Sequence, residues 1–149
     1  MRARVILGAD HGGFELKERL EGWLLKRGYE VVDMGADKLD SGDDFVDYAK
    51  KAVGEFRLGG DRLILLCRNG VGMSIVVNRF KNIRCVLGFD EEQIRRARVD
   101  DNVNCLSLPA DYIDLGKAKK FVSVFLETKF SEEERFVRRL KKIEEIVVD

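Results

Sequence analysis

The sequence LILLCRNGVGMS, residues 63–74, joins a short apolar run to a glycine-rich turn. Four consecutive aliphatic residues at its start are typical of a strand that is buried on both faces of a sheet. Gly70 and Gly72 let the backbone turn tightly into a helix. We therefore expect Cys67 at the carboxyl end of a central strand, beside a turn whose free amides can hold an oxyanion or a phosphate.

Short β-rich runs and amphipathic helices alternate on both sides of this stretch. Strands are predicted over residues 4–8, 29–34, 63–67, 83–89 and 103–108. Helices are predicted over 14–28, 45–56, 73–80, 91–99 and 113–128, with one more at the C-terminus. Parallel strands joined by helices form a sheet covered on both sides. The sequence thus predicts one α/β domain over residues 1–149, a Rossmann-like three-layer sandwich with a five-stranded parallel sheet and a C-terminal helix.

The helix ends carry their own signals. Asp90 is the expected N-cap of the helix over 91–99, and Ser131 with Glu134 has the spacing of a capping box before the last helix. That last helix has an apolar stripe made of Phe136, Leu140, Ile143 and Val147. One small domain does not cover the whole stripe, so we expect part of it to contact another subunit.

Composition excludes several classes of function. Lys plus Arg and Asp plus Glu number 27 each, so the net charge is zero and neither nucleic acid nor an anionic membrane is the expected partner. No stretch approaches the roughly 18 apolar residues of a membrane span, and residues 1–5 lead directly into a strand rather than a signal peptide. We expect a cytoplasmic protein.

The cysteine and histidine counts limit the possible metal and disulfide chemistry. Three cysteines without scaffold-like spacing do not indicate a disulfide framework, and one histidine without a CxxC pair does not indicate a zinc site. The turn after Cys67 is neither a phosphate-binding P-loop nor GxGxxG, so nucleotide binding gains little support. We expect no metal and no cofactor.

Ligands of open α/β sheets bind outside the carboxyl ends of the strands. We place three polar loops at that edge, over residues 10–13, 67–74 and 100–102. In the first loop His11 follows Asp10, and its imidazole suits hydrogen bonding to a substrate or acid catalysis near neutral pH. In the second, the amino terminus of the next helix favours the thiolate of Cys67, whereas Cys85 and Cys105 lie mid-strand and are expected to be buried apolar residues.

Arginines open the last predicted helix at positions 135, 138 and 139. Two guanidinium groups within four residues can bind one phosphate in a forked geometry. The same pattern also fits an ordinary solvated helix face, and the residues alone leave both interpretations open.

The segments around Cys67 and His11 resemble one known family. Residues 10–17, DHGGFELK, are similar to the opening motif of the ribose-5-phosphate isomerase B and galactose-6-phosphate isomerase family. Residues 67–78, ending MSIVVN, resemble that family's CGTGxGMSIAANK signature. The spacing of strands and helices is similar along the whole chain. The resemblance implies a Rossmann-like homodimer, or a higher homo-oligomer, that interconverts aldose and ketose phosphates without a metal or cofactor.

The resemblance also implies roles for individual residues. Cys67 is the base that moves a proton through an enediolate, and Asn69 replaces the threonine that steadies this intermediate. Asp100 occupies the position of the histidine that opens the sugar ring. The implied substrate-binding residues are Asp10, His11, Arg68, Gly70, Val71, Gly72, Met73, Ser74, Asp101, Arg135 and Arg139. The turn amides among them, residues 70–74, are expected to stabilise the developing oxyanion.

Several replacements within the pattern keep other functions open. Besides Asp100, Asp111 stands where the family has a third phosphate-binding arginine, and Phe45 stands where it has a tyrosine. Two added carboxylates near a phosphate pocket repel a dianion unless Arg68 compensates them. The alternatives to an active isomerase are therefore a sugar-binding homologue without turnover and one subunit of a heteromeric isomerase.

Overall fold

The computed structural model describes residues 2–147. Its strands are β1 (Arg4–Ala9), β2 (Glu30–Asp33), β3 (Arg62–Cys67), β4 (Cys85–Leu87) and β5 (Cys105–Pro109). Its helices are α1 (Phe14–Lys26), α2 (Phe45–Glu55), α3 (Val71–Val77), α4 (Glu91–Asp101), α5 (Leu115–Glu127) and α6 (Glu134–Glu144). The five strands form one sheet in the order β2-β1-β3-β5-β4, and every pairing is parallel. The predicted fold class is confirmed.

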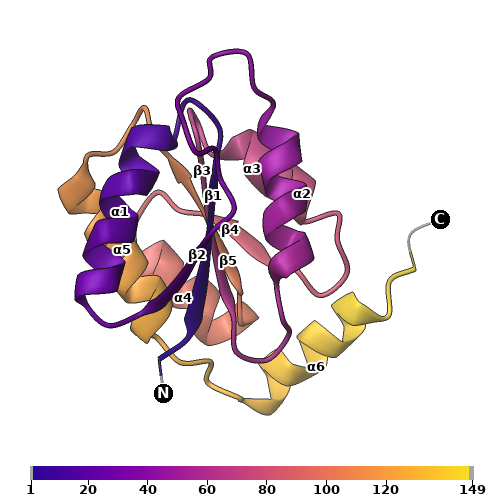
Figure 1. The fold of residues 1–149 in the computed structure, drawn as a ribbon. Helices are drawn as coiled ribbons and strands as arrows, with labels where there is room; N and C mark the ends of the chain where they lie inside the picture. The colour runs from indigo at the N-terminus through magenta and orange to yellow at the C-terminus, as the bar shows by residue number, and fades with distance from the viewer. Residues whose placement is uncertain (1, 148–149) are drawn as a thin grey trace.

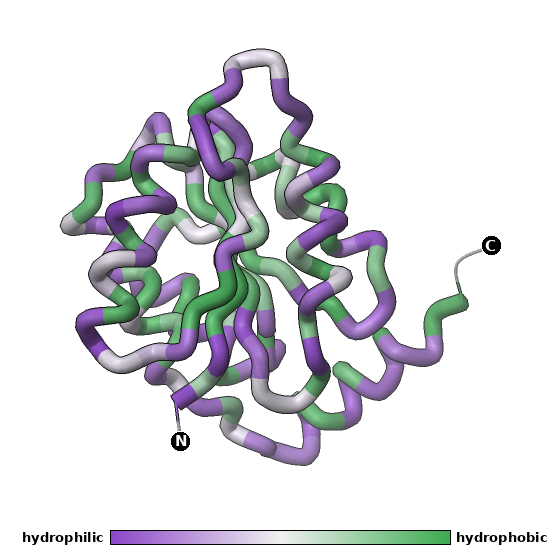
Figure 2. Tube along the Cα trace, viewed as in Figure 1, coloured by the Kyte–Doolittle hydropathy of each residue, from purple (hydrophilic) through white to green (hydrophobic). Residues whose placement is uncertain are grey.

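The sheet lies between two layers of helices (Figure 1). Helices α1, α4 and α5 cover one face, where Leu20, Ile94 and Phe121 pack on the central strands. Helices α2 and α3 cover the other face, where Ala52 and Met73 are fully buried. Strand β3 is central and apolar on both faces, as the run at 63–66 predicts, and Figure 2 shows the hydrophobic colour concentrated along the strands.

Of the two predicted helix caps, one is confirmed and the other is not. The Asp90 carboxylate accepts the amides of Glu92 and Gln93, which confirms the predicted N-cap of α4. The predicted capping box of α6 is wrong. Glu133 is the N-cap without a side-chain bond, and the Ser131 hydroxyl accepts only a 3.4 Å bond from the Glu133 amide. Glu132 has a φ of 58°, and this left-handed turn carries Ser131 away from the first turn of the helix.

Most element boundaries differ from prediction by one or two residues, and the larger differences, in α3 and β4, have local reasons. Helix α3 begins at Val71 rather than Met73, because Asn69 accepts the Val71 amide through its side chain and Gly70 takes a left-handed φ of 73°. Strand β4 covers only residues 85–87 because it lies at the edge of the sheet and pairs with β5 alone. No helix within residues 2–147 has both the length and the apolar character needed to cross a membrane.

Candidate active site

The order of the strands brings two of the predicted loops together. The chain leaves β1 toward β2 on one side and reaches β3 on the other, so the topological switch of the sheet lies between β1 and β3. Ala9 stands opposite Leu66 in the parallel register, which places Asp10 beside Cys67 at the carboxyl edge. This is the position where open α/β sheets bind their ligands.

Asp10 organises the first loop. Its Oδ1 accepts hydrogen bonds from the amides of Gly12 at 3.0 Å and Gly13 at 3.3 Å. Asp10 is only 6% exposed. The loop lies directly against the end of β3. A Cβ atom at Gly13 would come within 2.7 Å of the Leu66 carbonyl oxygen, so only glycine allows this approach.

Cys67 ends β3 with its side chain almost covered, at 4% exposure of the residue. In the turn that follows, Asn69 Oδ1 accepts the Val71 amide and the Gly70 carbonyl accepts the Ser74 amide. The backbone amides of residues 70–74 are expected to stabilise an oxyanion, and these two hydrogen bonds occupy two of the five. Within residues 2–147 the amides of Gly72 and Met73 have no such partner, but Met73 is fully buried, so the amide of partly exposed Gly72 is the one available to a ligand.

Arg68 crosses from the first loop to the end of β5. Its side chain packs on Gly12, where an added Cβ would stand 2.4 Å from the Arg68 Cγ. Its Nη1 lies 3.4 Å from both carboxylate oxygens of Asp111, and the Asp111 amide donates to the Arg68 carbonyl. Arg68 therefore does compensate the added carboxylate at position 111. The pair borders a cavity of about 540 Å³ that His11 and Arg19 also line.

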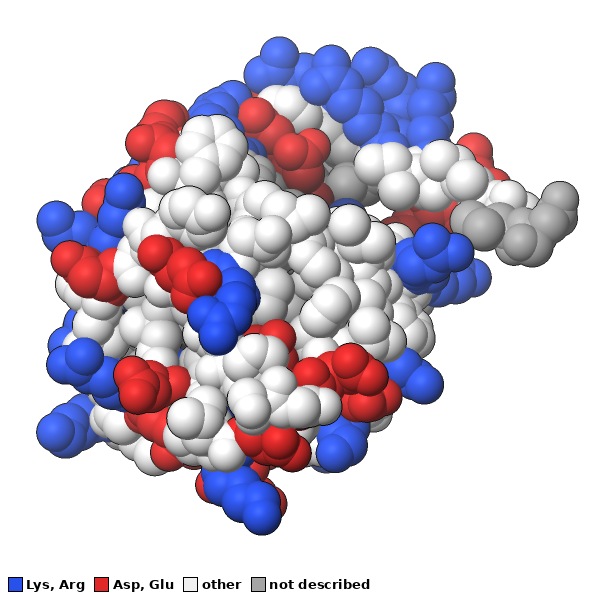
Figure 3. Space-filling view, turned by 90° about the horizontal axis from the view of Figure 1, so that it is seen from above, with Lys and Arg blue, Asp and Glu red and all other residues white. Residues whose placement is uncertain are grey.

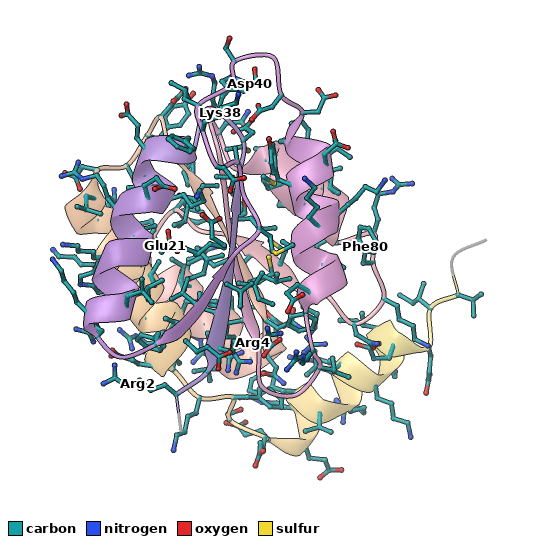
Figure 4. All side chains as sticks on the ribbon, viewed as in Figure 1. Arg2, Arg4, Glu21, Lys38, Asp40 and Phe80 are labelled. Atoms are coloured by element: carbon teal, nitrogen blue, oxygen red, sulfur yellow. The ribbon has the colours of Figure 1, made fainter. Side chains whose placement is uncertain are left out.

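The single histidine is held by a residue that the sequence did not single out. The Nδ1 of His11 lies 2.7 Å from Asp43 Oδ1, and the His11 backbone amide donates to the same oxygen at 3.1 Å. Asp43 lies in the loop between β2 and α2, and its side chain is only 5% exposed. Figure 4 shows this loop above the strand ends, with Asp40 and Lys38 labelled at its tip. Burial and the charge of Asp43 raise the pKa of Tyr48 on the adjoining helix.

Two groups of side chains within residues 2–147 have the composition of metal ligands. Asp10, His11 and Asp43 offer one ligand atom each, all within 4.8 Å of one another. The other group is Glu18, Glu21 and Asp33. In this second group the buried Lys17 ammonium already donates to Glu18 and Asp33, and that cation offsets part of the negative charge of the group. The expectation of no metal stays a prediction.

The third predicted loop, residues 100–102, does not lie at the carboxyl edge of the sheet, so this prediction is wrong. Asp100 and Asp101 end α4, and the carbonyl of the next residue, Asn102, accepts two bonds from Arg84 just before β4. The loop therefore lies at the amino edge of the sheet, opposite Cys67. The reason is directional, because a helix that follows a parallel strand must run back to the edge where the next strand begins.

The predicted phosphate ligands of the last helix also lie at this amino edge. Helix α6 runs beneath the sheet in Figure 1, on the side away from the loop of residues 35–44. Arg139 is close enough to Asp101 to oppose the rise that burial and the Asp100 charge cause in the pKa of Asp101. Arg135 donates to Glu133, and both arginines lie over the Phe136 ring. Within a single chain, Arg135 and Arg139 therefore lie at the opposite edge of the sheet from Cys67.

Comparison with known proteins gives consistent matches. A family model described as Ribose/Galactose Isomerase matches residues 5–143. Ribose-5-phosphate isomerase B of Mycobacterium tuberculosis is 31% identical over 141 residues, which cover 92% of this chain and 85% of the relative.

Solved structures agree in fold over the whole length. The crystal structure of a ribose 5-phosphate isomerase from Thermotoga maritima is 39% identical, with a TM-score of 0.89 over 98% of this chain and 100% of that chain. Ribose-5-phosphate isomerase B of Mycoplasma genitalium with bound ribulose-5-phosphate is 30% identical. Its TM-score is 0.86 over 95% of this chain and 93% of that chain.

Proposed function

Because the chain belongs to the ribose/galactose isomerase family and is a sugar phosphate isomerase of that family, we propose that Cys67 is its catalytic base. The Cys67 thiolate removes a proton from the carbon beside the substrate carbonyl, and the C–H electrons form an enediolate. The same proton returns to the neighbouring carbon while the hydroxyl proton on the second oxygen passes to the first oxygen, which converts an aldose phosphate into a ketose phosphate. The observation that carries this proposal is the position of Cys67 at the β1/β3 switch, next to Asp10 and the turn amides.

The turn after Cys67 supplies groups that favour the enediolate. The amide of Gly72 can donate to the oxyanion that develops on the substrate. Asn69 uses its Oδ1 on the Val71 amide, which leaves its Nδ2 as a further donor. Hydrogen-bond donors aimed at such a charge lower a barrier by several kcal/mol.

A second copy of the chain would complete this site. The phosphate ligands Arg135 and Arg139, and the proposed acid Asp100, lie at the far edge of their own sheet. Helix α6 buries only Phe136 of its apolar stripe, and Ile143 remains 50% exposed. We propose a homodimer in which α6 of one copy reaches the Cys67 edge of the other.

The surface around α3 suits such a contact. Large apolar side chains are exposed beside the Cys67 turn, on α2, α3 and the segment after β4. They are Val46 at 39%, Val71 at 40%, Ile75 at 58% and Phe89 at 69% exposure. Figure 3, which views the carboxyl edge of the strands, shows uncharged side chains across the middle of this face and charged ones around it. Contiguous apolar surface with a polar rim is typical of protein–protein contacts.

The test is isomerisation of a panel of aldose and ketose phosphates with five and six carbons. We expect the wild-type chain to turn over at least one of them, and Cys67→Ala to lose at least about 100-fold in kcat, the size of effect typical of a proton-transfer group. Cys85→Ala removes a thiol from β4 and serves as the matched control, with activity close to wild type. Equal activity of Cys67→Ala and wild type would exclude Cys67 as the base.

A further inference from the structure

The bond between His11 and Asp43 assigns a role to the imidazole that the proposed function does not use. We propose that His11 opens the furanose ring of the substrate through its Nε2, and that Asp43 is the positioning residue that orients it. The proposal rests on the proposed function, because a ring must open before Cys67 can act on a free aldehyde. The supporting observations are the two bonds to one oxygen of Asp43 and the burial of that carboxylate.

The two bonds determine which nitrogen of His11 carries the proton. A backbone amide can only donate, so Asp43 Oδ1 is an acceptor in its 3.1 Å bond from the His11 amide. The Asp43 carboxylate has no hydrogen of its own to donate, so the 2.7 Å bond to the ring assigns the hydrogen to Nδ1. In the neutral imidazole the other nitrogen, Nε2, is therefore an acceptor and a potential base. Within residues 2–147 this Nε2 has no hydrogen-bond partner.

The surroundings of Asp43 favour a positive imidazole during reaction. Its side chain is 5% exposed, and its Oδ2 is buried without a partner. Asp10 lies against Asp43, and Tyr48 adjoins it. Lys50 and Lys51 line the same surface pocket as Asp43. The Asp43 carboxylate in contact with Nδ1 stabilises the positive charge that the ring carries while it holds the substrate proton.

The proposed step moves one proton and needs no further reactant. Nε2 removes the proton from the anomeric hydroxyl as C1=O forms and the bond between C1 and the ring oxygen breaks. The bond electrons pass to the ring oxygen, which then takes the proton from Nε2, so the imidazole ends neutral. The ring is 22% exposed and, together with Arg68, lines a cavity at the carboxyl edge of the sheet. The opened aldehyde forms at the edge of the sheet where Cys67 ends β3.

Asp100 is the competing residue for this step, since the family resemblance places it at the position of the ring-opening histidine. Its carboxylate forms an ion pair with Arg96 at 2.9 Å, and it reaches a Cys67 site only from a second copy. His11 belongs to the same chain and the same sheet edge as Cys67. The two assignments make opposite predictions for variants.

Ring opening can be measured apart from isomerisation. In the Cys67→Ala chain the carbon proton transfer is blocked, while an intact His11 still interconverts the α and β anomers of ribose 5-phosphate, which NMR exchange spectroscopy detects. We expect the added variant Asp43→Ala to slow this exchange about 10-fold and His11→Ala about 100-fold. Asp44→Ala is the matched control, because Asp44 is exposed and its side chain caps nothing. An unchanged rate in Asp43→Ala, or a loss seen only in Asp100→Asn, would overturn the proposal.

A second readout reports the orientation of His11 directly. His11 is the only histidine in the chain, so its ring ¹⁵N signals are unambiguous. We expect the Nδ1–H form in the wild type, its retention in Asp43→Asn, which keeps an acceptor oxygen, and a mixture of forms in Asp43→Ala. A wild-type Nε2–H form would contradict the proposal even in an active isomerase. Absence of isomerisation in the whole sugar panel would instead count against the proposed function.

Discussion

Gly13 is the residue at which the first loop touches the end of β3. A Cβ atom there would lie 2.6 Å from the Leu66 Cβ and 2.7 Å from its carbonyl oxygen. The φ of Gly13 is −103°, which other residues also adopt, so the requirement for glycine comes from space alone. The obstacle includes backbone of the central strand, and that strand is held by β1 and β5 on its two sides.

We predict that Gly13→Ala destabilises the fold by about 2 kcal/mol, the usual cost of forcing one extra carbon into a packed site. Gly22→Ala is the control within α1, where an added Cβ meets nothing within 4 Å. It should stabilise the chain by about 0.5–1 kcal/mol because alanine is the better helix former. Urea unfolding of both variants measures the difference, and equal stabilities would show that the loop can move away from β3.

At the scale of elements, an ion pair joins β1 to the connection between α2 and β3. Arg4 contacts Asp61 through two nitrogens, at 2.7 and 3.2 Å, and the Arg57 amide donates to the same carboxylate at 2.8 Å. Burial acts to raise the pKa of Asp61, but the bonds from Arg4 and Arg57 outweigh it and the pKa lies below 3.8. Figure 4 shows Arg4 toward the amino ends of the strands, away from the candidate site.

This lowered pKa predicts a dependence of stability on pH. The contribution of Asp61 is fully present above its unfolded pKa of 3.8, and it is lost as pH falls through the lower folded value. Asp61→Asn should therefore cost about 1.5 kcal/mol at pH 7, because Arg4 and the Arg57 amide lose a charged acceptor. The cost is limited because Glu55 still pairs with Arg4 at 2.8 Å. That cost should shrink at pH values below 3.8. Urea unfolding at several pH values tests this expectation.

Glu127→Gln is the matched control for Asp61→Asn. Glu127 forms an ion pair with Arg27 in which both side chains are about half exposed, at 56% and 41%. Such surface pairs contribute little to stability. A cost at pH 7 as large as that of Asp61→Asn, or a cost of Asp61→Asn that stays constant into acid, would contradict the argument from burial.

For the whole molecule, the two edges of the sheet carry complementary halves of one predicted site. Cys67, Asp10 and His11 lie at the carboxyl edge, and Arg139 with Asp101 lies at the amino edge. The proposed dimer predicts that two inactive variants, each changed in a different half of the site, restore activity when they form a mixed dimer. Cys67→Ala and Arg139→Ala chains should each be inactive alone, and the mixed dimer should contain one intact site.

Coexpression of Cys67→Ala and Arg139→Ala chains with two different tags tests this prediction. If the chains pair at random, half of the dimers are mixed, and activity should return to about one quarter of wild type. The Cys67→Ala chain coexpressed with the double variant forms no intact site and is the control. If mixed dimers show no isomerase activity, Cys67 and Arg139 of the same chain act in the same site, which contradicts the proposed dimer. Full activity of the pure wild-type chain would show that no paralogous subunit is needed.

Local pattern was sufficient for much of this molecule. The aliphatic run at 63–66 predicts a buried central strand, because only a strand covered on both faces tolerates it. The alternation of strands and helices then predicts the parallel sheet, and the glycines after Cys67 predict the tight turn. These features depend on neighbours within a few residues, and the structure confirms each of them.

The amino-acid sequence by itself determined the fold class, the strand-end thiol and the loop of Asp10 and His11, since each depends on local backbone preference and burial. The tertiary structure decided which groups meet. Asp43 lies 32 residues from His11, and no periodic pattern links a loop carboxylate to a distant imidazole. The return direction of α4 placed Asp100 and Asp101 at the amino edge, opposite the site that the residues alone indicated. Such contacts follow from the path of the chain in space, which local spacing does not encode.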